Sequence, residues 1–234
     1  MNKDLKLYLG DRSFYREIIK IAIPISLQQL ITVGINLMDT IMLSSMGDAQ
    51  LSASSLAGQF INLFQICCMG IGMGASVLTA RFWGMQDKHS LRQSITLMLR
   101  LCLVFATAFT LATLIDPAMI MKIYSYDEEI INYGVSYLNW LLPTYYCMGL
   151  SLTCTIVLRS VGQVRLPLFS SIAAFFINVF FNWVFIFGKL GAPRMEIAGA
   201  ALGTLIARVL SWSLYADISS SKIRKYPTVS STCS

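Results

Sequence analysis

The amino-acid sequence predicts an all-α, polytopic membrane protein in which six transmembrane helices form one bundle. Of its 234 residues, 56% are hydrophobic and 13% are charged, and the mean hydropathy is +0.64. Soluble domains carry about 25% charged residues. The charges lie in short clusters between uncharged runs that approach the ~20 helical residues needed to cross hydrocarbon. This pattern argues against an ordinary soluble enzyme, a disordered chain and a nucleic-acid-binding protein.

The uncharged runs place the predicted helices. They are apolar on all sides and longer than the ~10 alternating residues of a membrane strand, which favours helices over a β-barrel. An amphipathic segment, 1–17, precedes them on the cytoplasmic side, and a polar tail, 216–234, follows them and is expected to be disordered. We expect no cleavable signal peptide, because the first run is too long and a polar stretch precedes it. Within the lobe, 18–215, we predict helices at about 18–45, 50–80, 93–115, 132–158, 166–188 and 197–215.

Lysine and arginine predict the orientation. With the N-terminus in the cytoplasm, 15 of the 18 basic residues lie on the inner side or at adjacent helix ends, Arg100 and Arg208 among them. Such a bias is typical of the positive-inside rule. We therefore expect a multi-pass protein of the plasma (inner) membrane whose basic residues meet anionic membrane lipid rather than nucleic acid.

Side chains for cofactor or metal chemistry are scarce. His89 is the only histidine, and five of the six cysteines fall inside predicted spans, where we expect free and inert thiols. The sequence therefore predicts no metal site, no cofactor and no catalytic residue.

One polar stripe crosses the first predicted helix. Gln28, Thr32, Asn36 and Asp39 follow one another at helical spacing, so they share a face that should line the interior of the lobe. Asp39 is the only acidic residue well inside a span. An embedded carboxylate is a functional candidate by default, because a charge in hydrocarbon costs several kcal/mol.

Three groups on later helices match Asp39 in depth. Asn178 and Asn182 are one turn apart on the fifth predicted helix, and Thr204 lies in the sixth. At 1.5 Å per residue, all four lie ~8–15 Å from the outer end of their helices. If these helices are neighbours, one carboxylate, two amides and a hydroxyl form a site for a small hard cation or a proton. The alternative is that they form a structural hydrogen-bond network.

Proline and glycine interrupt two of the spans. Pro24 and Pro143 should kink or loosen the first and fourth helices. Gly199 and Gly203 open the sixth helix with a face that permits close helix packing.

Five segments, in order, resemble the N-terminal half of the multidrug and toxic compound extrusion (MATE) family. The resemblance covers about residues 14–212. The segments are IAIPISLQQLITVGINLMDTIMLSSMG (21–47), ARFWGMQD (80–87), LRSVGQVRLPL (158–168), INVFFNWVFIFG (177–188) and IAGAALGTLIA (197–207).

The resemblance implies a twelve-helix antiporter of two six-helix lobes. A cleft between the lobes would export lipophilic or cationic compounds in exchange for H⁺ or Na⁺. By the resemblance, Asp39 takes the coupling ion, Asn178 and Thr204 line its site, and Pro24 is a hinge. Asn182 stands where one branch of the family has a second acid, which leaves H⁺ and Na⁺ both open as the coupling ion.

The chain has about half the length that the family implies. We therefore expect a truncated product that would need a complementary C-lobe or a second copy of itself. Three alternatives stay open: a lipid-linked saccharide flippase of the same broad fold, an inactive pseudo-transporter, and an intramembrane enzyme. The enzyme is disfavoured because only one acid is embedded. The flippase would need cationic side chains in the cavity, for which only Arg100 and Arg208 could reach inward.

Overall fold

A computed structural model describes residues 12–191, 193 and 195–223, and within them it contains helices and no strand. This confirms the predicted all-α class. The helices are α2 (Arg12–Ser44), α3 (Asp48–Gly84), α4 (Lys88–Ile115), α5 (Pro117–Tyr124), α6 (Glu128–Ser160), α7 (Arg165–Phe187) and α8 (Ile197–Ile223).

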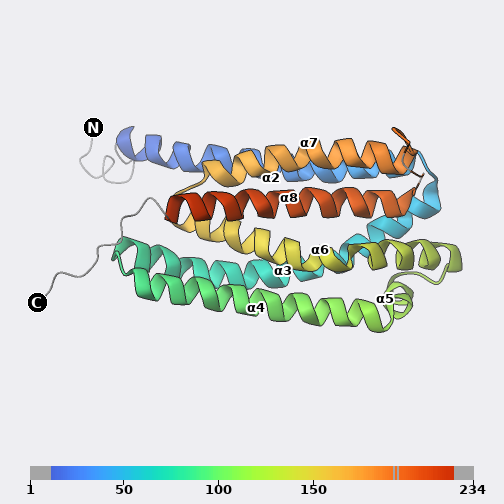
Figure 1. Ribbon diagram of the computed structural model, residues 1–234, viewed down its shortest axis with the longest axis horizontal. Helices are drawn as coiled ribbons and strands as arrows, with labels where there is room; N and C mark the ends of the chain where they lie inside the picture. Colours follow the sequence, from blue (N-terminus) through green and yellow to red (C-terminus); the bar gives the residue numbers. More distant parts are fainter. Residues whose placement is uncertain (1–11, 192, 194, 224–234) are drawn as a thin grey trace, which may run out of the picture.

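Six long helices run side by side in one bundle (Figure 1). Among the described residues, five are long and apolar enough to span a membrane, namely α2, α3, α4, α6 and α7, and α8 contains a shorter apolar run, Ile197–Ser211. The predicted six-helix bundle is confirmed. The mean hydropathy of the apolar window in these five helices is between 1.5 and 2.0, which explains why uncharged runs located them.

The bundle has two halves that meet at α6 and α8. In one half, α7 packs between α2 and α8, and in the other, α3, α4 and α6 pack against one another. The contact between α6 and α8 joins the halves, whereas α2 touches α3 and α8 only slightly (Figure 1). This separation of α2 from α3 leaves room for the cavity described below.

Charge distinguishes the two ends of the bundle. The first end, here called the basic end, holds the starts of α2, α4 and α7 and the ends of α3 and α6 (Figure 1). It carries Arg16, Lys20, Arg81, Lys88 and Arg165. The opposite, acidic end carries Asp48, Asp116, Asp127, Glu128 and Glu129.

Several helix boundaries differ from the predicted ones. The helix that contains Asp39 already begins at Arg12, so residues 12–17 are not a separate segment, and residues 1–11 lie outside the described part. At the other end, α8 continues to Ile223, eight residues beyond the predicted end of the lobe, so 216–223 is helical rather than tail. The rest of the predicted tail, 224–234, lies outside the described residues.

The short helix α5 lies between the third and fourth predicted helices, where the sequence predicted no helix. Asp116 starts it: its Oδ1 accepts a hydrogen bond of 2.8 Å from the Met119 amide, and Pro117 occupies the first turn. A side-chain cap followed by proline is typical of a helix start. The buried Met121 of α5 then packs against Gly134 of α6.

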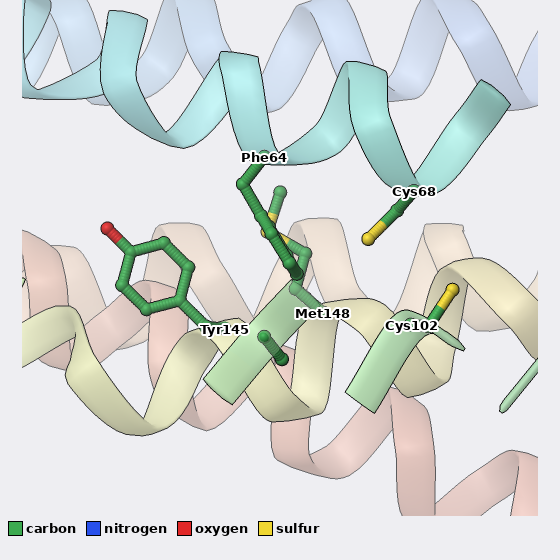
Figure 2. Packing of buried hydrophobic residues seen from close by; sticks show 6 residues of the cluster. Phe64, Cys68, Cys102, Tyr145 and Met148 are labelled. Atoms are coloured by element: carbon green, nitrogen blue, oxygen red, sulfur yellow. The ribbon is translucent and has the colours of Figure 1, made fainter. Parts of the chain in front are cut away.

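The largest part of the core lies between α3, α4 and α6. Phe64 and Tyr145 meet edge to face with ring centroids 5.3 Å apart, and Cys68, Cys102, Ala106 and Met148 complete the cluster (Figure 2). Both cysteines are free, as are Cys67, Cys147 and Cys154. The prediction of free thiols inside the spans is confirmed for these five.

Glycine allows α7 and α8 to approach closely. A Cβ at residue 199 would lie 2.7 Å from the Phe185 carbonyl carbon and 2.9 Å from the Ile186 amide nitrogen. Those atoms belong to helical backbone and cannot move aside independently. Packing of small residues is how membrane helices gain close contact.

We therefore expect Gly199→Ala to destabilise the bundle by about 1–3 kcal/mol, as overpacking does. The matched control is Gly74→Ala, because a Cβ at residue 74 on α3 meets no atom within 4 Å. Denaturant unfolding in detergent micelles measures both. Equal stability of the two variants would contradict the close packing of α7 on α8.

Candidate functional site

A cavity of about 930 Å³ opens between α2, α3, α6 and α8. It lies where α2 separates from α3, and α6 and α8 contribute its remaining walls. Polar side chains contribute a large share of the lining. The lining polar and charged residues are Thr32, Asn36, Asp39, Thr40, Ser52, Ser54, Ser55, Gln59, Asn62, Gln65, Tyr137, Thr144, Thr204 and Arg208.

The four predicted cation-site residues form one hydrogen-bonded chain. Asn182 Nδ2 donates to Asp39 Oδ1 at 2.5 Å and to Asn178 Oδ1 at 3.2 Å. Asn178 Nδ2 donates to Thr204 Oγ1 at 3.4 Å. The expectation that the three helices bring these side chains together is therefore met.

These hydrogen bonds can form because α7 lies between α2 and α8. Asn178 and Asn182 are four residues apart, so both project from one face of α7, and they are 1% and 0% exposed. Asp39 and Thr204 flank them from α2 and α8 and also line the cavity. The asparagines thus connect two cavity walls from behind.

Gly203 holds Asn182 in place by having no side chain. A Cβ at residue 203 would lie 2.0 Å from Asn182 Oδ1 and 3.1 Å from its backbone nitrogen. Asn182 Oδ1 is buried and has no hydrogen-bond partner among the described residues. On the other side of the amide, Asn182 Nδ2 donates to Asp39.

Two further side chains near Asp39 were not predicted as part of the site. Arg208 lines the same cavity and lies within electrostatic reach of the Asp39 carboxylate, although the sequence placed it toward the inner end. Its spacing of four residues from Thr204 is the signal that could have found it. Tyr137 of α6 also lines the cavity close to Asp39, and nothing in the sequence distinguishes it from the other tyrosines.

The predicted polar stripe divides into two parts. Thr32 and Asn36 line the cavity with Asp39, as expected. Gln28 is absent from the cavity wall and is buried instead. It donates to Ser171 Oγ at 2.9 Å and accepts from Arg159 Nη2 at 2.7 Å, joining α2 to α7 and α6. Gln28 therefore faces the interior of the lobe, as predicted for the stripe, but it forms a contact between helices there and is not part of the cavity wall.

The structure also places Arg100 and the two prolines that the sequence singled out. Arg100 does not reach into the lobe, because its side chain lies in a shallow concavity on the outer face of α4. Pro24 lies within α2, which continues through it as a single helix, and α6 does the same at Pro143.

The donor set indicates what this site can do. No group of three or more His, Cys, Asp or Glu side chains that could hold a metal ion occurs among the described residues. Asp39 offers one carboxylate, partly accessible from the cavity and hydrogen-bonded by a buried amide. A single carboxylate with neutral oxygen neighbours suits a proton or one monovalent cation.

Comparison with known proteins identifies the family to which this sequence is related. The MatE family model matches residues 24–184. The probable multidrug resistance protein NorM of Thermotoga maritima is 25% identical over 193 residues, which is 82% of this chain and 42% of that protein. The probable multidrug resistance protein NorM of Neisseria meningitidis serogroup B is 27% identical over 189 residues, 79% of this chain and 40% of that protein. The chain thus spans less than half the length of these relatives.

Solved structures share the fold. An outward-facing multidrug resistance MATE family transporter of the MOP superfamily superposes with a TM-score of 0.81 at 22% identity, covering 97% of this chain and 49% of that one. A MATE protein crystallised in the bent conformation gives a TM-score of 0.81 at 21% identity, covering 100% of this chain and 52% of that one. Each match corresponds to about half of the larger protein.

The hydrogen-bonded chain predicts a large cost for losing Asn182. We expect Asn182→Leu to lower the free energy of unfolding by about 2–4 kcal/mol, because the half-buried Asp39 and the buried Asn178 each lose a donor. Asn36→Leu is the control, since Asn36 is exposed on the cavity wall, and it should change stability by less than about 0.5 kcal/mol. Denaturant unfolding in micelles measures both, and similar costs for the two variants would contradict the network.

Proposed function

Because this chain belongs to the MatE family, we propose that it forms one lobe of a cation-coupled exporter of lipophilic or cationic small molecules. The observation that carries the proposal is the position of Asp39. Its carboxylate faces a cavity of about 930 Å³ on one side and is held by Asn182 of α7 on the other. A substrate in the cavity and a coupling ion at the carboxylate would therefore act on the same group.

The coupling would follow from charge. An ionised Asp39 attracts a cationic substrate into the cavity, and a proton or cation bound at Asp39 cancels that attraction. Two ligands that favour opposite charge states of one group weaken each other's binding by the same factor. If the cavity opens alternately to the two sides of the membrane, the substrate is released on one side and the ion on the other.

Proton coupling is the form that the hydrogen-bond pattern supports better. A sodium site needs several oxygen ligands directed at one point. Here the Asn182 amide directs its nitrogen at Asp39, and Gly203 packs against its oxygen. Asn178 likewise directs its nitrogen at Thr204. Donors around a carboxylate stabilise its charged form between proton transfers.

The proposed lobe needs an aqueous or protein surface opposite its cavity. Several polar side chains on α2 and α3 are exposed at positions within the spans, and facing lipid they would be costly. They are Asn36, Thr40, Ser55, Gln59 and Asn62. We therefore propose that this face lines a cleft closed by a complementary C-lobe or by a second copy of the chain.

The basic end supports a cytoplasmic N-terminus and a plasma (inner) membrane location for the proposed exporter. Its lysines and arginines would meet the inner leaflet by the positive-inside rule. The flippase alternative is weaker, because Arg208 is the one lysine or arginine among the described residues that line the cavity. Holding a pyrophosphate would take several.

Linked binding of a substrate and a proton tests the proposal. The purified chain in detergent is titrated with ethidium at a series of pH values, with and without Na⁺. As the pH is lowered into the range in which Asp39 is protonated, we expect the affinity for ethidium to fall about tenfold for each unit of pH. The reason is that one proton competes with one cation. Added Na⁺ should have little effect at constant ionic strength.

Asp39→Asn should remove this pH dependence, whereas Asp48→Asn, a matched change at the exposed start of α3, should keep it. A pH dependence that survives in Asp39→Asn would reject Asp39 as the coupling group. Competition by Na⁺ that is lost in Asp39→Asn would replace H⁺ with Na⁺. Transport is then followed in proteoliposomes as ethidium efflux driven by a pH gradient.

A further inference from the structure

A second concavity, of about 460 Å³, lies on α4, far from the Asp39 cavity. All of its lining residues are exposed, and all belong to the first half of this helix. Three of them carry or can carry positive charge. The lining residues are His89, Arg92, Gln93, Thr96, Leu97 and Arg100, here called the α4 groove.

The α4 groove faces away from the bundle. The buried residues of α4, among them Met98, Cys102 and Ala106, lie on one face and pack toward α3 and α6. At 100° per residue, Thr96 lies about 120° and Arg100 about 160° around the helix from the centre of that face. In Figure 1, α4 forms the edge of the bundle, so the groove is on its periphery.

The two guanidinium groups of the groove are not neutralised by the protein, because the side chains of Arg92 and Arg100 make no hydrogen bond or ion pair within the described residues. His89 differs, since the Asp87 carboxylate accepts a hydrogen bond from its amide and lies close to its ring. An exposed arginine presents a planar fork of donors that matches a phosphate group. The groove is therefore complementary in charge and geometry to a phosphate.

Depth places this groove at the surface of the membrane. The apolar run that follows Arg100 ends at Ile115, about 22 Å away along the helix. With ~30 Å of hydrocarbon, Arg100 would start about 8 Å inside the apolar layer and Arg92 just outside it. Side chains on a helix tilt toward its N-terminus, so Arg100 extends toward Thr96 and the headgroups, as a snorkelling arginine does.

The same face of α4 continues as an apolar stripe. Leu97, Val104 and Leu111 are 58%, 63% and 53% exposed and follow one another along the helix below the groove. A phosphate held by the arginines would therefore have hydrocarbon surface beneath it. This combination fits a lipid, which has an anionic head and apolar tails, and not a soluble phosphate.

We propose that the α4 groove is a binding site for an anionic phospholipid in the leaflet at the basic end of the bundle. Arg92 and Arg100 hold the phosphate, Gln93 offers a further donor, and the acyl chains lie along Leu97, Val104 and Leu111. The site is separate from the Asp39 cavity and does not rest on the proposed transport function.

Lipid binding to the delipidated full-length chain tests this site. Native mass spectrometry compares phosphatidylglycerol with phosphatidylcholine of the same acyl chains. We expect selective retention of phosphatidylglycerol. The double variant Arg92→Gln/Arg100→Gln should lower its affinity about 30-fold, because each arginine near an anionic headgroup accounts for about fivefold. The variant Arg92→Lys/Arg100→Lys should keep most of the affinity.

The control is Arg16→Gln/Lys20→Gln, which removes the same charge from exposed positions of α2 at the same end. Its affinity should fall much less than that of the glutamine variant of α4. Equal binding of both lipids, or equal loss in the control variant, would overturn the proposal. Competition by millimolar inorganic phosphate would overturn the lipid assignment. If the glutamine variant does not fold, the preference for phosphatidylglycerol is measured on the lysine variant and on the unchanged protein. Absence of that preference in both would also overturn the proposal.

Discussion

The hydrogen bond between Asp39 of α2 and Asn182 of α7 is the contact on which the candidate site depends. It places the half-buried carboxylate of Asp39 where a neutral amide supports its charge and where the cavity can still reach it. A carboxylate inside a membrane without such a partner would be costly. Helix α7 therefore acts as a rigid support, and α2, which has few other neighbours, is held mainly by it.

That support has requirements elsewhere in the fold. Asn182 can direct its nitrogen to Asp39 only because Gly203 leaves room beside its oxygen. Gly199 draws α8 onto α7 one turn earlier, which sets Thr204 against Asn178. At the basic end, Gln28 ties the same helix α2 to Ser171 and Arg159. Small residues and amides thus fix the geometry in a bundle whose remaining contacts are mostly apolar.

Much of this arrangement could be predicted from the sequence, because membrane thickness and helical rise are strict constraints. Spacing and depth placed Asp39, Asn178, Asn182 and Thr204 at matching levels of their helices, whereas their grouping also required those helices to be neighbours. Contacts between helices distant in sequence could not be derived in this way. Gln28 shares the spacing of the polar stripe, yet Arg159 and Ser171 take it out of the cavity. Arg100 and Arg208 read alike in sequence, but one faces outward from α4 and the other lines the cavity. The helix α5 was missed because eight residues give no periodicity to detect.

The most direct measurement of the central claim is infrared difference spectroscopy of the purified chain during a pH titration. Protonation of an embedded carboxyl group produces a carbonyl stretching band whose frequency depends on its hydrogen bonds. If Asp39 is bonded to Asn182, one such band is absent in Asp39→Asn and is shifted in frequency in Asn182→Leu. A band that survives in Asp39→Asn, or that keeps its frequency in Asn182→Leu, would contradict the account.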